Sequence, residues 1–148
     1  MTDPASKLQT LEPMRAAVVL TVLLGVLTMV TGVYFAVLRP PVLPEDIRLT
    51  GVSPDLLPPA FLQWLSIVFR TWGGFTIGFG ILLVSTGMFL SKGNRRWLRA
   101  GLGASALISF GPFLASNVQI QSASVGYIAV LFFVSVGVAA TQLKRSDP

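Results

Sequence analysis

The sequence contains no cysteine and no histidine among its 148 residues. The absence of cysteine excludes disulfides, thiolate metal ligands and thiol nucleophiles. The absence of histidine removes the commonest metal ligand, the usual haem ligand and the side chain most used for acid–base catalysis near neutral pH. We therefore expect no metal site and no cofactor.

Charge is also scarce. Only 11% of the residues are charged and 53% are hydrophobic, whereas a soluble domain carries about a quarter charged residues. A soluble chain of this composition would expose large apolar patches and aggregate. The net charge of +5 does not indicate a nucleic-acid partner, because the basic residues stand beside apolar runs. The composition predicts a membrane protein surrounded by membrane lipids, with no nucleic acid bound.

The first apolar run, residues 16–38, contains no charged residue. As a helix it would be about 34 Å long, enough to cross a hydrocarbon core of about 30 Å. A secretory signal peptide is the alternative, but its apolar region should be only about 7–15 residues long and end in small residues. This run is longer and ends in Tyr34, Phe35 and further large side chains. It predicts an uncleaved transmembrane span.

The second apolar run is longer than one crossing and contains Arg70. Residues 71–90 alone give a helix of about 30 Å. This assignment places Arg70 near the outer interface of the membrane. Residues 60–70 then form an amphipathic lead-in, with Trp64 and Trp72 at the depth that interfacial aromatic side chains prefer.

Two further runs follow, at residues 98–116 and 125–143. Pro112 lies inside the third run and lacks a backbone N–H, which predicts a kink in that helix. A short polar turn separates the two runs. The sequence therefore predicts an all-α fold, a four-transmembrane-helix bundle made of one integral membrane domain, residues 1–148.

Basic residues near the ends of the spans predict the orientation of the chain. With the amino terminus inside, the cytoplasmic segments contain Lys7, Arg15, Lys92, Arg95, Arg96, Arg99, Lys144 and Arg145. The outer segments contain Arg39, Arg48 and Arg70. This bias predicts a multi-pass protein of a bacterial plasma (inner) membrane, with both termini cytoplasmic.

The outer loop between the first two spans, residues 39–59, is rich in proline. Ser53, Pro54 and Asp55 form the pattern of a helix start, because a hydroxyl at the N-cap, a proline at the first position and an acid in the first turn each favour it. We expect an ordered cap on the membrane surface with a short helical turn. A disordered loop is the alternative.

Arg70 is the one charged residue within a long apolar run, and such a residue is a candidate functional site. It is our first candidate binding residue, for a ligand or a lipid phosphate. The alternative is a structural role in which Arg70 reaches the outer headgroups or pairs with Asp55, Glu45 or Asp46.

Four basic residues lie in or beside the short cytoplasmic turn: Lys92, Arg95, Arg96 and Arg99. They are first of all the signal for topology. Each also adds about 1 kcal/mol of attraction to an anionic membrane surface. We therefore predict that these four residues contact anionic lipid headgroups.

Small residues recur at the spacing of packed membrane helices. Gly73, Gly80 and Gly87 are seven residues apart, and Gly74 and Gly78 are four apart. A similar series in the first span consists of Thr21, Gly25, Thr28 and Gly32. Such seams let helix backbones approach closely. They predict packing within the bundle, a homo-oligomer interface or a groove for lipid.

The four predicted spans contain no aspartate or glutamate. Proton-coupled transporters usually need such a residue or a histidine within the membrane. Small four-helix drug exporters use a glutamate in the first helix, but Glu12 precedes the span here. The polar residues of the spans are hydroxyls, which can bond to carbonyls of their own helix. No catalytic triad or carboxylate pair can be assembled, so we expect no enzyme activity.

The pattern Arg70-x-x-Gly73-Gly74-x-x-x-Gly78-x-Gly80, with a loop before it and two more helices after it, resembles the small bacterial four-helix membrane proteins called DoxX-like. The resemblance covers about twenty residues and implies a four-helix bundle without implying an activity. Our leading expectation is a structural or accessory membrane subunit that packs against another membrane protein or a second copy of itself. The alternative is a carrier or channel for a small neutral or lipidic molecule.

Overall fold

The computed structural model describes residues 4–90 and 95–143, and within these ranges all regular structure is helical. The long helices are α1 (Pro4–Val33), α3 (Pro59–Leu90), α4 (Arg96–Gln119) and α5 (Val125–Leu143). Three short elements lie between α1 and α3: the π-helical turn η1 (Tyr34–Leu38), α2 (Pro44–Thr50) and the 3₁₀ turn η2 (Pro54–Leu56).

All four long helices are long and apolar enough to cross a membrane, at Arg15–Leu38, Pro59–Leu90, Arg96–Gln119 and Val125–Gln142. The predicted all-α bundle of four membrane helices is therefore confirmed. These are the features of a multi-pass membrane protein.

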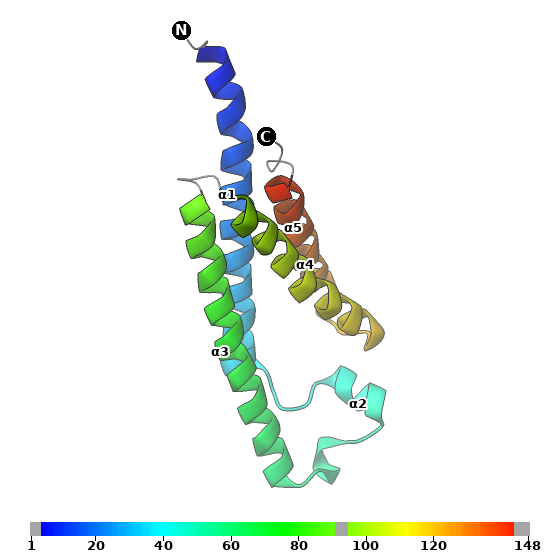
Figure 1. Cartoon of the computed structure of the whole chain (residues 1–148). Helices are drawn as coiled ribbons and strands as arrows, with labels where there is room; N and C mark the ends of the chain where they lie inside the picture. The colour runs from blue at the N-terminus through cyan, green and yellow to red at the C-terminus, as the bar shows by residue number, and fades with distance from the viewer. Residues whose placement is uncertain (1–3, 91–94, 144–148) are drawn as a thin grey trace.

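The long helices form two pairs (Figure 1). α1 packs along α3, α4 packs along α5, and contacts between α1 and α5 join the pairs. The start of α1 and the end of α5 lie at one end of the bundle, which we call the terminal end, and α2 lies at the opposite end, which we call the loop end (Figure 1). The backbones of α3 and α4 make few close contacts, and the two pairs diverge toward the loop end (Figure 1).

Glycines set the close approach of α1 and α3. A Cβ atom added to Gly80 would lie 2.7 Å from the carbonyl oxygen of Gly25, and one added to Gly32 would lie 2.8 Å from that of Gly73. Neither distance leaves room for a side chain. The predicted packing role is therefore confirmed for the seam that contains Gly73 and Gly80. Gly74 and Gly78 differ, because a Cβ on either would meet nothing within 4 Å.

The hydrophobic core lies toward the terminal end, where all four long helices converge. Each of them contributes buried side chains to one cluster: Leu24, Leu83, Leu90, Leu102, Ala106, Phe110, Leu131 and Val138. Phe110 is the member of this cluster nearest to the loop end on α4. Beyond it the two helix pairs separate.

Two helix starts differ from the prediction. The first helix begins at Pro4, well before the predicted start at residue 16. Residues 60–70 are not a separate lead-in but the first part of α3, whose 32 residues extend about 48 Å at 1.5 Å per residue. α3 is therefore longer than a hydrocarbon core is thick. α4 continues on both sides of Pro112 as one helix, and the kink expected there stays a prediction.

The loop between α1 and α3 is ordered, as predicted, and Ser53 precedes the short turn η2. The sequence reading missed α2. Pro44 occupies its first turn, the Asp46 carboxylate accepts a hydrogen bond from the backbone N–H of Leu43 at 2.8 Å, and Gly51 ends it with φ of +69°. These are ordinary signals of a helix start and a helix end.

Candidate functional site

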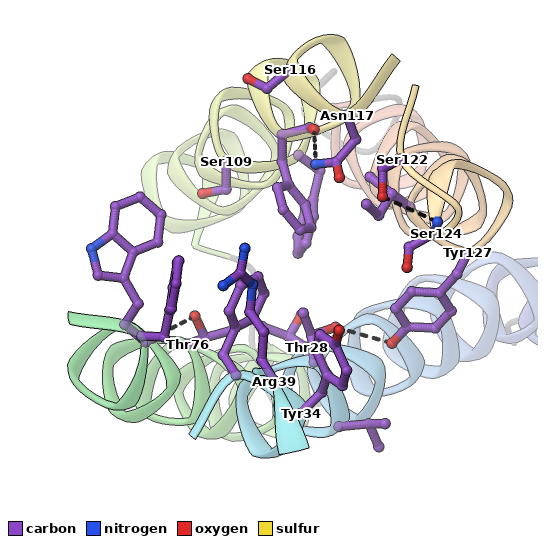
Figure 2. A pocket seen from close by; sticks show the side chains of 18 of the residues that line it. Thr28, Tyr34, Arg39, Thr76, Ser109, Ser116, Asn117, Ser122, Ser124 and Tyr127 are labelled. Carbon is purple, nitrogen blue, oxygen red and sulfur yellow. Dashed lines mark hydrogen bonds between the residues drawn. The ribbon is translucent and has the colours of Figure 1, made fainter. Parts of the chain in front are cut away.

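A cavity of about 950 Å³ lies between the α1–α3 pair and the α4–α5 pair at the loop end (Figure 2). Its lining combines aromatic side chains, aliphatic side chains and hydroxyls. The residues are Thr28, Val30, Thr31, Tyr34, Phe35, Arg39, Leu43, Glu45, Phe69, Trp72, Phe75, Thr76, Phe79, Ser109, Phe110, Pro112, Phe113, Ser116, Asn117, Ile120, Ser122, Ser124, Tyr127 and Ile128.

The cavity follows from the divergence of the two helix pairs. Phe110 belongs both to the hydrophobic core and to the cavity wall, so the cavity begins where the core ends. Trp72 and Phe75 line it from α3 although they are 64% and 76% exposed. Since α3 and α4 barely touch, these two rings lie at an opening on the side of the bundle.

The π-helical turn η1 brings polar groups to the loop end of the cavity. The backbone N–H of Arg39 bonds to the carbonyl oxygen of Tyr34 at 2.8 Å, a spacing of five residues. A π turn contains one more residue than an α turn and is frequent at functional sites. Tyr34, Phe35 and Arg39 all line the cavity as a result.

Arg39 extends from the end of η1 toward the centre of the cavity (Figure 2). Its side chain is only 9% exposed. One guanidinium nitrogen lies 3.3 Å from the Asp46 carboxylate, and the guanidinium carbon lies 3.4 Å from the centre of the Phe69 ring. Burial lowers the pKa of Arg39, while the negative charge of Asp46 acts in the opposite direction. The buried charge is therefore only partly compensated.

Contacts from α2 close the loop end. The Ser122 hydroxyl, in the turn between α4 and α5, donates to the buried Glu45 carboxylate at 2.9 Å. Arg48 donates to the carbonyl oxygen of Gln121 at 2.7 Å. The pKa of Glu45 is lowered, chiefly because its own backbone N–H bonds to the carboxylate and also because of Ser122 and Arg48. α2 thus ties the first helix pair to the second.

Tyr127 bridges α5 and α1 beside the cavity (Figure 2). Its hydroxyl donates to the carbonyl oxygen of Leu27 at 3.0 Å and lies 3.0 Å from the hydroxyl of Thr31. Several threonine hydroxyls of the spans bond to carbonyls of their own helix, as the sequence predicted. Thr28 and Thr76, for example, donate to carbonyls one turn earlier on their own helices, at 2.6 and 2.8 Å.

A second polar cluster lies at the terminal end, around Arg99, which is 2% exposed. Arg99 donates to the side-chain oxygen of Gln142 on α5 at 2.7 Å and to the carbonyl oxygen of Leu90 at the end of α3 at 2.9 Å. Gln142 in turn donates to Thr21 on α1 at 3.3 Å. One guanidinium group on α4 is thereby connected to all three other long helices.

These positions correct part of the predicted lipid site. Arg99 is buried and hydrogen-bonded within the bundle, so its side chain is not presented to lipid headgroups as we expected. Arg95 and Arg96 are exposed, as a headgroup contact requires, and their lipid binding stays a prediction. Lys92 lies outside the described residues.

Arg70 is exposed on α3 and does not line the cavity. Among the described residues the one ion pair joins Arg39 to Asp46, so Arg70 pairs there with none of Asp55, Glu45 and Asp46. Its predicted contact with the outer headgroups stays a prediction. A ligand role for Arg70 stays a prediction. The cation that lines the cavity is Arg39. From the sequence, Arg39 was interpreted only as one of the basic residues of the outer segments. In the sequence, Arg39 follows the aromatic residues Tyr34 and Phe35 at the end of the first span, and this was the available signal.

Comparison of the chain with protein-family models, with curated proteins and with solved structures finds no match. The resemblance to DoxX-like proteins therefore stays a prediction.

Replacing Arg99 with leucine should lower the free energy of unfolding by about 1–3 kcal/mol. The variant leaves the buried oxygens of Gln142 and Leu90 without this donor. Thermal unfolding in a mild detergent measures the effect. The control is Arg96→Gln on the same helix turn, whose exposed side chain should change stability by less than about 0.5 kcal/mol. Equal stability of both variants would contradict the conclusion that the hydrogen bonds of Arg99 stabilise the bundle.

Glu45 should make the stability of the protein depend on pH. Its folded pKa lies below the ordinary value of 4.5, so its contribution is fully present above pH 4.5 and is lost as pH falls through the lowered pKa. At neutral pH, Glu45→Gln should cost about 1 kcal/mol, the usual contribution of a hydrogen bond. Melting temperatures of wild type and variant should converge at low pH. Asp55→Asn, at an exposed carboxyl, is the control. Its melting temperature at neutral pH should equal that of wild type, so no difference is lost at low pH.

Proposed function

We propose that this chain is a multi-pass protein of a bacterial plasma membrane that binds a small lipidic molecule in the loop-end cavity. The observation that supports this function is a cavity of about 950 Å³ between two diverging pairs of membrane helices. In the orientation that the basic residues favour, both termini are cytoplasmic and the cavity opens in the outer half of the membrane. The function is that of a carrier or binding protein.

The lining of the cavity supports an amphipathic occupant. Phe75, Phe79 and Phe113 offer apolar surface, whereas Arg39 and Tyr34 at the loop end offer polar groups. Binding sites for small molecules generally combine apolar walls with a few polar groups that fix orientation. The lateral opening at Trp72 and Phe75 provides a route from the hydrocarbon region of a bilayer.

We propose binding rather than catalysis because the available side chains offer little for acid–base or metal chemistry. The chain has neither cysteine nor histidine. No group of three carboxylate, imidazole or thiol side chains comes together among the residues that the structure describes. The one carboxylate in the cavity lining, Glu45, is engaged in holding α2.

Filling the cavity tests this function. Ser109→Trp places a large ring in the cavity lining and should reduce co-purified lipid, measured by mass spectrometry after mild solubilisation, by about fivefold or more. Ser105→Trp is the matched control: both serines lie on α4 and are exposed, but only Ser109 lines the cavity. Equal lipid content in both variants would contradict binding in the cavity.

An accessory role is the second candidate, and a separate face of α3 favours it. Gly74 and Gly78 leave the helix backbone open, with nothing within 4 Å of an added Cβ, beside Thr71 and Leu82. Small residues four apart are common where two membrane helices meet. This face has the features that a partner helix from another subunit or a second copy requires.

The accessory role predicts that Gly78→Leu abolishes self-association or co-purification of a partner. Crosslinking in membranes followed by gel electrophoresis detects either one. Gly101→Leu is the control, because Gly101 on α4 is equally open. A wild-type chain that stays a monomer without a partner would exclude this candidate and leave the lipid-binding proposal intact.

A further inference from the structure

We propose that the molecule bound in the cavity is an anionic single-chain amphiphile, whose phosphate or carboxylate head binds the Arg39 guanidinium and whose chain extends toward the opening between α3 and α4. This inference rests on the lipid-binding function proposed above. It adds the chemical class of the ligand and its direction in the site.

Arg39 retains hydrogen-bonding capacity. A guanidinium has five N–H donors, and the described residues accept three bonds from Arg39: Pro40 O at 3.0 Å, Pro41 O at 3.4 Å and Asp46 at 3.3 Å. The bonds to Pro41 and Asp46 are long for charge-assisted contacts. Two donors remain on a side chain that is only 9% exposed and lies in the cavity wall.

The charge of Arg39 also favours an additional anion. Asp46 forms its shorter hydrogen bond, 2.8 Å, with the backbone N–H of Leu43 at the start of α2. Its stronger hydrogen bond therefore stabilises the start of α2, and its bond to Arg39 is the weaker one. The pKa of Arg39 is lowered because burial outweighs the stabilisation that its neighbours provide. An anion bound at the remaining donors would restore that stabilisation.

The other charged residue of the cavity lining, Glu45, forms no ion pair with Arg39, although its negative charge acts on the guanidinium. The Glu45 carboxylate accepts from Ser122 at 2.9 Å on the side of the α4–α5 turn. One face of the planar Arg39 guanidinium is covered by the Phe69 ring, whose centre lies 3.4 Å from the guanidinium carbon. The polar head is thus limited to the edge of the guanidinium, the geometry that suits a phosphate or carboxylate.

The size of the cavity fits one chain. At the ~30 Å³ that an atom such as a water oxygen occupies in a liquid, 950 Å³ holds about thirty non-hydrogen atoms. Hexadecyl phosphate has about twenty. Beyond Arg39 the walls are aromatic, and at the opening Trp72 is 64% exposed and Phe75 76% exposed. A chain directed this way leaves the cavity at the hydrocarbon depth of a bilayer.

The test compares hexadecyl phosphate with hexadecanol, which has the same chain and no charge. Binding to the full-length protein in detergent is measured by native mass spectrometry or by quenching of tryptophan fluorescence. Wild type should bind the phosphate at least tenfold more tightly than the alcohol. Arg39→Gln should weaken phosphate binding by about tenfold to a hundredfold, in line with the loss of a charged hydrogen-bond partner, and leave alcohol binding unchanged.

Arg70→Gln is the matched control, since Arg70 is an arginine of the same end of the bundle that lies outside the cavity. It should not change binding of either probe. Arg39→Lys preserves the charge and should retain phosphate binding within about fivefold. If Arg39→Gln does not yield a monodisperse protein, the comparison of Arg39→Lys with wild type and of the two probes on wild type still decides the question.

Three results would overturn the inference. Equal affinity of wild type for the phosphate and the alcohol would exclude recognition of an anionic head. If Arg39→Gln and Arg70→Gln lost equal affinity for hexadecyl phosphate, the effect would belong to the general surface charge of the protein. Inorganic phosphate that binds as tightly as hexadecyl phosphate would assign the site to free phosphate. Failure of both probes to bind wild type would contradict the lipid-binding function itself.

Discussion

The structure depends on one buried cation at the terminal end. Arg99 on α4 bonds to Gln142 on α5 and to the carbonyl oxygen of Leu90 on α3, and Gln142 continues the chain of bonds to Thr21 on α1. Burial of a charge costs several kcal/mol unless hydrogen bonds compensate it. Leu90 is the last residue of α3, so its carbonyl has no partner within the helix and lies at the negative end of the helix dipole. The hydrogen bond between Arg99 and Leu90 therefore compensates the buried charge and also gives the terminal carbonyl of α3 a partner.

The four long helices converge at that end, whereas the two helix pairs diverge toward the loop end (Figure 1). The glycines of α1 and α3 hold that pair together along its length, and no comparable contact joins α3 to α4. The two pairs are connected by contacts between α1 and α5, which include the Tyr127 hydroxyl, and by hydrogen bonds from the α4–α5 turn to Glu45 and from Arg48 to that turn. The cavity is therefore a consequence of the packing: one pair is fixed by close backbone contact, and the second pair diverges from it. Beyond Phe110 the side chains between the two pairs therefore line a cavity and do not form a continuous core.

Much of the fold was predictable from the sequence, because run length and periodicity are local properties. Residues 125–143 were predicted to the residue as the span that the structure shows as α5, and the spacing of Gly73 and Gly80 indicated the α1 contact. The site was not predictable in the same way. In the sequence, Arg70 lies within a long apolar run, whereas Arg39 and Arg99 lie at the ends of apolar runs. One lies in a cavity, one is exposed and one is buried, and these environments depend on side chains distant in the sequence, such as Gln142 and Phe69.

The contents of the cavity follow from its lining. A space of about 950 Å³ left without atoms would forfeit the dispersion contacts of every side chain around it. Water satisfies Arg39 and Tyr34 at the loop end, but along Phe75, Phe79 and Phe113 it would find few hydrogen-bond partners, and ordered water needs two to four of them. Hydrocarbon satisfies the aromatic walls but leaves the guanidinium uncompensated. A molecule with a polar head and one apolar chain meets both conditions at once, because the guanidinium of Arg39 lies at the loop end and the exposed rings of Trp72 and Phe75 lie at the lateral opening.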